Sequence, residues 1–567
     1  MAETVKTTRC LLCSLACPLA LDTSSIGSSG EVLTEYVADD VVTQGRLCYR
    51  GHYLAEMATH PLRLTAAALG GAPVSLAKAI AEIAAALHRA GVSAALVVDG
   101  NLATEDIVSA LLLGKRVVGT DLVAVYLPAT DAAMLRGLAP DVPLLSLEAL
   151  GRCRAFLVVG DAFATHPVLS RLVLEARQER KAPLFAMDCL PNHVSGFAHQ
   201  FLRVRPGGEA AALAAICRLA GAPLAPESAW AEGQSASALA AMAGLDEPAL
   251  RPVADTLRRS APAALLLAPV AGRMANVRAA AAATSSLASA CGGQVLPLFN
   301  YGNAVGAARA ASAVGARTLE AMMDAVRQGK VSVLLALGLD LLRVLPEADA
   351  EVLRARVGLL AVGAAFYGRS TAAAWAVVPL AMWFEGEGSI FAAGGARLAV
   401  GAAIPPPSGA LSARALCERL ASEMGAVLPP APNLDGFNVF VGEPTVPVLP
   451  EVGEAGLKLV AKADVPDFHA GEISRALAWP RHLEPEPEVC LGPAEARAQG
   501  LARGAKVIVR ASGREAAARV RIASDIPAGM ATISAAFPET RSLFARRTLA
   551  GEPELLPVEA GLSQEAH

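Results

Sequence analysis

Short apolar runs alternate with Ala-rich segments of helical period over most of the chain. The runs are four or five residues long and most are followed by Gly or Asp; they cover residues 94–98, 156–159, 184–187, 264–267, 333–337 and 359–362. Continuous apolar runs of this length are typical of strands in a parallel sheet that is buried on both faces. The Ala-rich segments predict helices that cover such sheets, so the pattern indicates an α/β fold of the doubly wound type.

The residues that follow two of these runs predict where helices begin. Thr104 is the expected N-cap of the helix after 94–98, with Glu105 and Asp106 near its positive end. Pro167 is expected in the first turn of the helix after 156–159.

The pattern changes in the last third of the chain. Pro and Gly accumulate between residues 403 and 450, which predicts a linker or an irregular surface segment. After a helix at 493–499, the stretches 506–510, 518–522 and 531–534 predict short antiparallel strands. Strands of this length close most readily into a small β-barrel.

Composition narrows the class of protein. The 567 residues exceed what one core holds and suggest roughly three or four domains, while 54% hydrophobic and 18% charged residues with a mean hydropathy of +0.43 argue against extended disorder. A net charge of −4 without a basic run argues against nucleic-acid binding. No apolar stretch is long enough to span a membrane, and no secretory segment fits before residue 10, so we expect a cytoplasmic protein.

Four cysteines near the start have the spacing of an iron-sulfur site. Two residues separate Cys10 from Cys13, three separate Cys13 from Cys17, and thirty separate Cys17 from Cys48. A 4Fe-4S cube needs four converging thiolates, one per iron, and a compact loop with one remote cysteine supplies them. Structural Zn²⁺ is the alternative, although zinc sites usually come as two separate pairs. The other six cysteines are isolated and are expected to be small core residues.

Polar and small residues at strand ends predict a second kind of site. In doubly wound sheets, ligands bind outside the carboxyl ends of the strands, which makes Gly160, Asp161, Asp188, Gly338 and Asp340 candidates for contact with a nucleotide-like group. Turn and capping roles are an equal alternative for each of them. The dinucleotide fingerprint and the phosphate-loop motif do not occur where they would be needed, so free NAD or ATP is not the expected ligand.

Further short motifs follow the cysteine segment in a fixed order. They lie at residues 59–65, 160–168, 204–213, 295–306, 383–389 and 494–537. In this order, together with the cysteines, they resemble the molybdopterin oxidoreductase superfamily over nearly the whole chain. The likeness is to formate dehydrogenase catalytic subunits, the large iron-sulfur subunit of complex I and formylmethanofuran dehydrogenase.

The resemblance implies a domain organisation and a cofactor set. It implies a 4Fe-4S cluster domain at residues 1–60. The first of two interleaved α/β domains would comprise residues 61–125 with 331–430, and the second residues 126–330. A linker at 431–450 would lead to a C-terminal barrel of the pterin-dinucleotide-binding type at 451–567. The cluster would lie close to one pterin of a molybdenum or tungsten bis-pterin guanine dinucleotide cofactor. The nucleotide tails would pass Gly160, Asp188, Gly338 and Asp340. Many members place a Lys between cluster and pterin where this chain has Arg50, which keeps the positive charge.

One departure from the superfamily concerns the metal. Formate-type members carry a Cys or selenocysteine followed by a His in the stretch that corresponds to residues 119–131, and this chain has neither there. Asp131 is a weak candidate for an oxygen ligand, although an Asp at a helix start is the more ordinary interpretation. His166 is a similarly weak candidate for proton transfer.

Two functions therefore remain open from the sequence. The first is an oxidoreductase subunit that acts on a formate-like small substrate and passes electrons through one 4Fe-4S cluster. The second is a subunit that keeps the fold and the cluster but has lost the metal, and serves as an electron relay or scaffold without catalytic activity. Because no second cysteine set follows, both imply partner subunits that carry further iron-sulfur clusters or a flavin.

Overall fold

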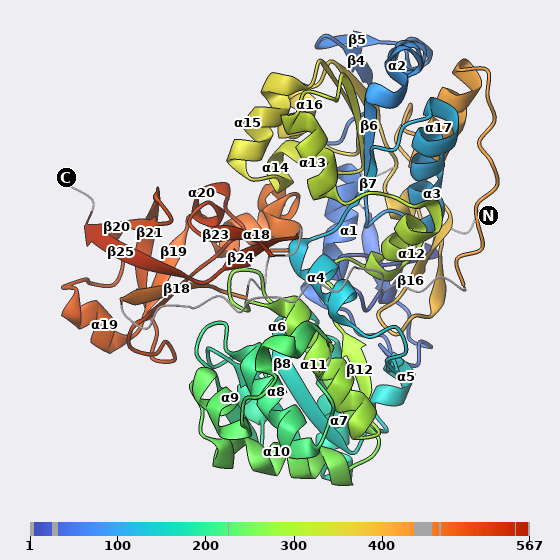
Figure 1. Ribbon diagram of the computed structural model, residues 1–567. Coiled ribbons are helices and arrows are strands. Elements are labelled where there is room, and N and C mark those ends of the chain that lie inside the picture. Colours follow the sequence, from blue (N-terminus) through green and yellow to red (C-terminus); the bar gives the residue numbers. More distant parts are fainter. Residues whose placement is uncertain are drawn as a thin grey trace. The chain divides into compact units, whose positions relative to one another are not determined.

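The computed structural model describes residues 5–24, 32–224, 226–435, 456–463, 467–549 and 552–564. The chain forms two compact units, one of residues 1–127 with 301–439 and the other of residues 128–300 with 440–567 (Figure 1). Each unit is thus built from two separate stretches of chain. No helix in the described ranges is long and apolar enough to cross a membrane.

The first unit contains a seven-stranded sheet whose central strands are the apolar runs. Five neighbouring strands are parallel, and an antiparallel hairpin extends the sheet at one edge. The order is β5 (Ala72–Val74), β4 (Ala67–Leu69), β15 (Ala376–Pro379), β14 (Leu359–Ala364), β13 (Val333–Leu337), β6 (Ala94–Asp99) and β7 (Val123–Tyr126). The chain runs from β6 outward to β7 and then returns to β13 on the other side. The topological switch point of this sheet therefore lies between β6 and β13.

Helices cover both faces of this sheet, as the Ala-rich segments predict. One group packs together on one face and the other group on the opposite face (Figure 1). The first group comprises α2 (Leu76–Ala90), α3 (Thr104–Leu112), α12 (Ala304–Val314) and α17 (Ala413–Glu423). The second comprises α13 (Leu319–Arg327), α14 (Leu341–Val344), α15 (Glu347–Arg356) and α16 (Arg369–Ala373).

A small substructure at the N-terminus carries the cysteines. Three antiparallel strands, β1 (Val5–Arg9), β2 (Pro18–Asp22) and β3 (Leu33–Tyr36), are followed by helix α1 (Tyr49–Thr59). The loop between β1 and β2 packs against the hairpin of β16 (Gly388–Phe391) and β17 (Arg397–Val400), where Leu11 and Ala16 share a small core with Ile390 and Val400.

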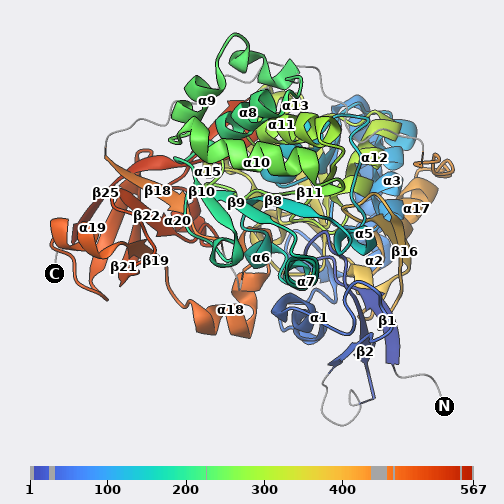
Figure 2. The ribbon, with the colours of Figure 1, turned by 90° about the horizontal axis from the view of Figure 1, so that it is seen from below.

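The second unit contains a five-stranded sheet that is parallel throughout. Its order is β10 (Gln200–Arg203), β9 (Leu184–Asp188), β8 (Ala155–Gly160), β11 (Ala263–Ala268) and β12 (Gln294–Pro297). The strand order reverses between β8 and β11, so this is its switch point. Figure 2 shows α8 (Glu209–Ala220), α10 (Glu247–Arg259) and α11 (Val277–Ala290) on one side of the sheet, and α6 (Ala162–Thr165) and α7 (Leu169–Arg180) on the other.

The second unit also contains a closed six-stranded barrel. Its order is β18 (Leu457–Ala461), β22 (Met530–Ile533), β19 (Glu488–Leu491), β21 (Arg514–Ile522), β20 (Lys506–Ala511) and β25 (Val558–Gln564). Alternate residues of β20 point into its core, including Val507 and Val509. The expected antiparallel pairing is confirmed for β20 with β21, whereas β21 and β22 each have one further neighbour in parallel, β19 and β18 respectively. Parallel pairing needs a crossover, and helix α19 (Pro493–Ala498) with β20 supplies it between β19 and β21.

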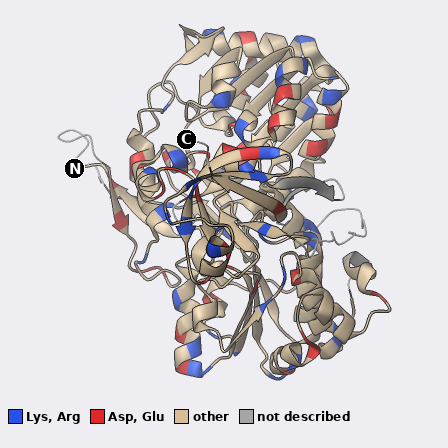
Figure 3. Ribbon diagram, turned by 90° about the vertical axis from the view of Figure 1, so that its left-hand side faces the viewer, with Lys and Arg blue, Asp and Glu red and all other residues tan. Residues whose placement is uncertain are grey.

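The apolar runs all form strands in the structure, and the strands of both sheets carry few charged residues compared with the helices around them (Figure 3). Two helix starts differ from the expectation. Ala103 rather than Thr104 is the N-cap residue of α3, and α7 begins at Leu169 after the separate short helix α6. Helices α12 and α13, expected in the second α/β domain, belong to the first unit. Residues 436–450 of the expected linker lie outside the described residues.

Candidate functional site

The four cysteines of the N-terminal motif line one small cavity. Cys10, Cys13 and Cys17 lie on the loop between β1 and β2, and Cys48 is the N-cap residue of α1; the cavity is completed by Leu47, Arg50 and Gly51. The backbone N–H of Cys10 donates to the carbonyl of Cys17 at 2.9 Å, where the two strands meet. This short closure forces the loop to curl so that its three cysteines converge.

Burial makes the three loop thiols poor acids. It raises the pKa of Cys13 to about 11 and raises those of Cys10 and Cys17 well above the ordinary value, and the neighbouring cysteines raise them further. Several thiolates placed close together in a buried cavity repel one another unless a cation lies between them. The donor set therefore suits a metal centre, because coordination removes the thiol protons.

Arg50 brings a positive charge to the same cavity. Its side chain is buried, and its Nε donates to the Tyr49 hydroxyl at 3.1 Å. Burial lowers the pKa of Arg50, but its interactions with Tyr49, Cys13 and Cys48 together outweigh that effect and the pKa is raised overall. The guanidinium therefore stays charged beside the four sulfurs.

Asp188, at the end of β9 in the second unit, is held by a buried ion pair. Arg273 Nε lies 2.8 Å from Asp188 Oδ1, Arg273 Nη2 lies 2.8 Å from Oδ2, and the two side chains are 5% and 2% exposed. Asn192 Nδ2 donates to the same carboxylate at 2.8 Å and to the carbonyl of Gly160 at 3.2 Å. Both oxygens of Asp188 therefore have donors from the protein itself.

Asp161, which follows β8, orients a histidine. Its Oδ1 accepts from the backbone N–H of Ala164 at 3.3 Å, and its Oδ2 lies 3.0 Å from Nδ1 of His193. The Asp161 side chain is 2% exposed and that of His193 57%. The hydrogen bond that His193 donates to Asp161 raises the pKa of His193. His193 is therefore a titratable group that is held at Nδ1 while more than half of its side chain is exposed.

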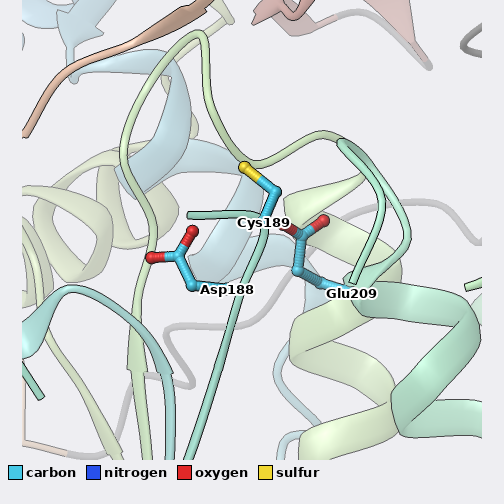
Figure 4. A group of neighbouring side chains, drawn as sticks. All are labelled: Asp188, Cys189 and Glu209. Carbon is cyan, nitrogen blue, oxygen red and sulfur yellow. The ribbon is translucent and has the colours of Figure 1, made fainter. Parts of the chain in front are cut away.

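A cluster that the sequence analysis did not identify lies behind these groups. Ligand atoms of Asp188, Cys189 and Glu209 are within 4.8 Å of one another, and all three residues are buried (Figure 4). Arg273 already neutralises Asp188, and burial raises the pKa of Glu209 well above its ordinary value. A neutral Glu209 beside the ion pair explains the cluster without a metal ion. Glu209 and Arg273 reach Asp188 only through the fold. Their spacing in the sequence gives no sign of this contact.

The strand-end glycines are required by packing. Gly160 has a φ of +89°, and an added Cβ would clash with the carbonyl of Ala268 on β11. Gly338 has a φ of +86°, and its Cβ would press against Leu102 and Asp99. Both glycines lie at the switch points of their sheets, where backbone and ligand can approach closely.

Asp340 caps a helix. Its Oδ2 accepts from the backbone N–H of Arg369 at 2.7 Å and its Oδ1 from that of Ser370 at 2.8 Å, both in the first turn of α16. This is a structural role for the carboxylate, in line with the capping alternative that the sequence left open.

The two weak catalytic candidates lie together in the second unit, at the end of β12. Asp131 is 0% exposed, and its Oδ1 accepts from the backbone N–H of Asn300 at 3.0 Å and from Asn300 Nδ2 at 2.9 Å. Nε2 of His166 lies 3.0 Å from the carbonyl of Phe299 and must donate to it. A third group, His469, was not predicted, and its Nε2 donates to the carbonyl of Asn300 at 3.2 Å. These side chains fix the backbone at residues 299–300.

The described chain combines several sheets of mixed α/β type with a closed six-stranded C-terminal barrel. One solved structure of similar fold is acetylene hydratase from Pelobacter acetylenicus, with a TM-score of 0.76 and 13% sequence identity, covering 99% of this chain and 100% of that one. At this identity the likeness establishes the fold. No protein-family model and no curated protein matches the chain by sequence.

Proposed function

We propose that the protein is a redox subunit of the molybdopterin oxidoreductase type. In this proposal it passes electrons between a molybdenum or tungsten bis-pterin site, acting on a formate-like small substrate, and partner subunits. One 4Fe-4S cluster held by Cys10, Cys13, Cys17 and Cys48 carries the electrons. The observation that carries the proposal is the convergence of these four cysteines on one buried cavity beside Arg50.

The arrangement of the cysteines along the chain supports a cube over a zinc ion. Three of them share one loop and the fourth lies on a remote segment, which suits a cube with one iron for each thiolate. Structural zinc sites usually take their thiolates as two separate pairs.

The pterin dinucleotide is supported by the fold and by the switch points. The solved structure of similar fold matches over its whole length, barrel included. Gly160 and Gly338 take the positive φ of the tight turns at the two switch points, where a dinucleotide tail would lie. Asp188 would contribute through the ordered group that it forms with Asn192 and Arg273. Asp340 would act only through the turn that it caps.

A metal-free electron relay or scaffold is the second candidate function. It is favoured by the stretch 119–131, which supplies no thiolate, and by the engagement of Asp131 with Asn300. Under this proposal the cluster and its partners remain, and substrate chemistry is absent.

Metal and pterin analysis of the purified protein tests both candidates. About four irons with one molybdenum or tungsten per chain and extractable pterin supports the enzyme, whereas iron alone supports the relay. The variant Cys13→Ser is expected to lose the paramagnetic signal of the reduced cluster. Cys153→Ser, at a buried cysteine elsewhere, is the matched control and is expected to retain it. Native protein without iron would refute both candidates.

A further inference from the structure

Arg50 occupies a position that its own helix does not favour. It is the second residue of α1, whose first turn contains no acidic residue. The N-terminal end of a helix carries a partial positive charge, so a cation is unfavourable there. Arg50 is also only 5% exposed, because it lines the cysteine cavity. Groups other than the helix backbone must therefore hold its guanidinium in place.

Tyr49, the preceding residue, supplies one of these groups. Nε of Arg50 donates to the Tyr49 hydroxyl at 3.1 Å, and the guanidinium carbon lies 5.6 Å from the centroid of the Tyr49 ring. Consecutive residues of an α-helix point in different directions and do not normally face each other. Helix geometry alone therefore does not produce this contact, and the two side chains must turn toward each other to make it.

The ring of Tyr49 is itself held in position. It lies edge-on to the ring of Tyr53, one helical turn later, at a centroid distance of 6.0 Å and an interplanar angle of 65°. Tyr53 is 4% exposed and belongs to the buried side of α1. Aromatic pairs with this edge-to-face geometry are stabilising. The Tyr49 hydroxyl is therefore an acceptor at a fixed place, and it fixes Nε of Arg50 in turn.

The place of this charge matters for electron transfer at the cavity. Reduction adds one negative charge to an iron-sulfur cluster, so a positive charge nearby stabilises the reduced form. The Coulomb energy between the two charges falls with distance, and it falls further when the cation reaches water. A guanidinium that is held at the cavity wall therefore acts on a cluster more strongly than one that is free to turn toward solvent.

We propose that Tyr49 is a positioning residue, whose hydroxyl holds the Arg50 guanidinium against the cysteine cavity and thereby raises the reduction potential of the cluster. The inference rests on the proposed function, because it requires the cluster at this cavity. The step that it affects is the one-electron reduction, in which the oxidised cluster gains one electron from an external donor and no bond is made or broken. Tyr49 and Arg50 are neither oxidised nor deprotonated.

A redox titration of the full-length protein and its variants tests the proposal. Dithionite is the electron donor, and electron paramagnetic resonance follows the reduced cluster. The variant Tyr49→Phe keeps the ring, with its contacts to Tyr53 and Arg50, and removes only the hydroxyl. It is expected to lower the equilibrium constant for reduction by about threefold, which corresponds to a potential more negative by about 28 mV at about 59 mV per tenfold change.

The double variant Tyr49→Phe/Arg50→Gln separates positioning from a direct effect on the cluster. If the hydroxyl acts through the guanidinium, its removal changes nothing once Arg50 has been replaced. The potential of the double variant should therefore equal that of Arg50→Gln alone. The matched control is Tyr36→Phe, which removes a hydroxyl that lies 3.4 Å from Nε2 of His52 at the protein surface, and it should keep the wild-type potential.

The outcomes separate this inference from the function on which it rests. An iron-containing Tyr49→Phe variant with the wild-type potential would overturn the positioning role and leave the cluster standing. An equal shift by Tyr49→Phe with and without Arg50, or an equal shift by Tyr36→Phe, would also overturn it. Loss of iron in Tyr49→Phe but not in Tyr36→Phe would assign the hydroxyl to the assembly of the site and overturn its role in the potential. Wild-type protein without iron would overturn the proposed function and this inference together.

Discussion

Arg63 and Glu385, 322 residues apart in the chain, form an ion pair in the interior of the first unit, in which one guanidinium nitrogen contacts both carboxylate oxygens. Arg63 Nη2 lies 2.8 Å from Oε1 and 2.7 Å from Oε2 of Glu385, and the side chains are 5% and 1% exposed. The pair joins two of the short motifs that the sequence singled out, at 59–65 and at 383–389. These motifs are therefore at least in part structural elements of the fold.

The ion pair is poorly solvated, which leads to a prediction on stability. Burial lowers the pKa of Arg63 and raises that of Glu385, and Nε and Nη1 of Arg63 have no hydrogen-bond partner in the described structure. Glu385→Gln should destabilise the protein by about 3–5 kcal/mol, because it leaves a buried charge unpaired. The double variant Arg63→Met/Glu385→Leu should recover most of this loss. Chemical denaturation measures both.

A surface pair provides the control for that prediction. Arg251 and Glu247 are paired one turn apart on α10, and both side chains are open to solvent. Glu247→Gln is expected to cost no more than about 0.5 kcal/mol. An equal loss in Glu385→Gln and Glu247→Gln would contradict the role of burial.

Glu209 leads to a prediction on pH dependence. An unfolded Glu ionises near pH 4.5, whereas burial raises the pKa of Glu209 in the folded state well above that value. The folded state therefore holds a proton that the unfolded state has lost, so this group lowers stability as the pH rises above 4.5. The variant Glu209→Gln removes this effect. Its free energy of unfolding, relative to that of the wild type, should therefore increase by up to about 1.4 kcal/mol for each pH unit above this value.

Melting temperatures at pH 5 and pH 8 test the Glu209 prediction. The control variant Glu351→Gln, at an exposed position of α15, should show the same difference in melting temperature from the wild type at both pH values. A pH-independent difference for Glu209→Gln would mean that Glu209 is ionised in the folded protein.

The elements that the sequence predicted correctly are those whose signal is local. Strands such as 156–159 and 333–337 are continuous apolar runs because both faces of a parallel sheet are covered. The cysteine site could be proposed from spacing because three of its residues share one loop. The apolar runs and the cysteine spacing can therefore both be recognised within a few tens of residues of sequence.

The features that the sequence could not supply depend on distant pairings. Arg273 lies 85 residues from Asp188, and no pattern in either segment indicates that they meet. The parallel contacts of the barrel join strands that are not neighbours in the chain. At α3, Thr104 lost its expected capping role because its hydroxyl contacts Asn303, 199 residues away. Tertiary contacts of this kind override local preference.

The Asp161–His193 pair leads to a prediction on titration. The hydrogen bond that His193 donates to Asp161 raises the pKa of His193, and Asp161→Asn should lower this pKa toward the ordinary value while keeping the cap on α6. The contribution of the pair to stability should be present below the pKa of an unfolded His and be lost as the pH rises through the folded pKa. Nuclear magnetic resonance of ¹³C-labelled histidine, with His193→Gln for assignment, measures this shift. An unchanged pKa in Asp161→Asn would show that the bond is absent in solution.

Arg50 leads to the last prediction, on the potential of the proposed cluster. A buried guanidinium beside the cysteines favours the addition of an electron, so Arg50→Gln should make the reduction potential more negative, by an amount on the order of 60 mV, equivalent to about 1.4 kcal/mol for one electron. Arg50→Lys keeps the charge and should change the potential less. A redox titration followed by electron paramagnetic resonance gives these values.

Arg46 is the matched control for the Arg50 prediction, because it lies near the same cysteines in sequence but is exposed. Solvent screens its charge, so Arg46→Gln should leave the potential nearly unchanged. If Arg46→Gln and Arg50→Gln shift the potential equally, net charge rather than the buried guanidinium sets it. If neither shifts it while iron is retained, Arg50 does not act on the cluster, and its buried position serves only the packing of α1 against the cysteine loop.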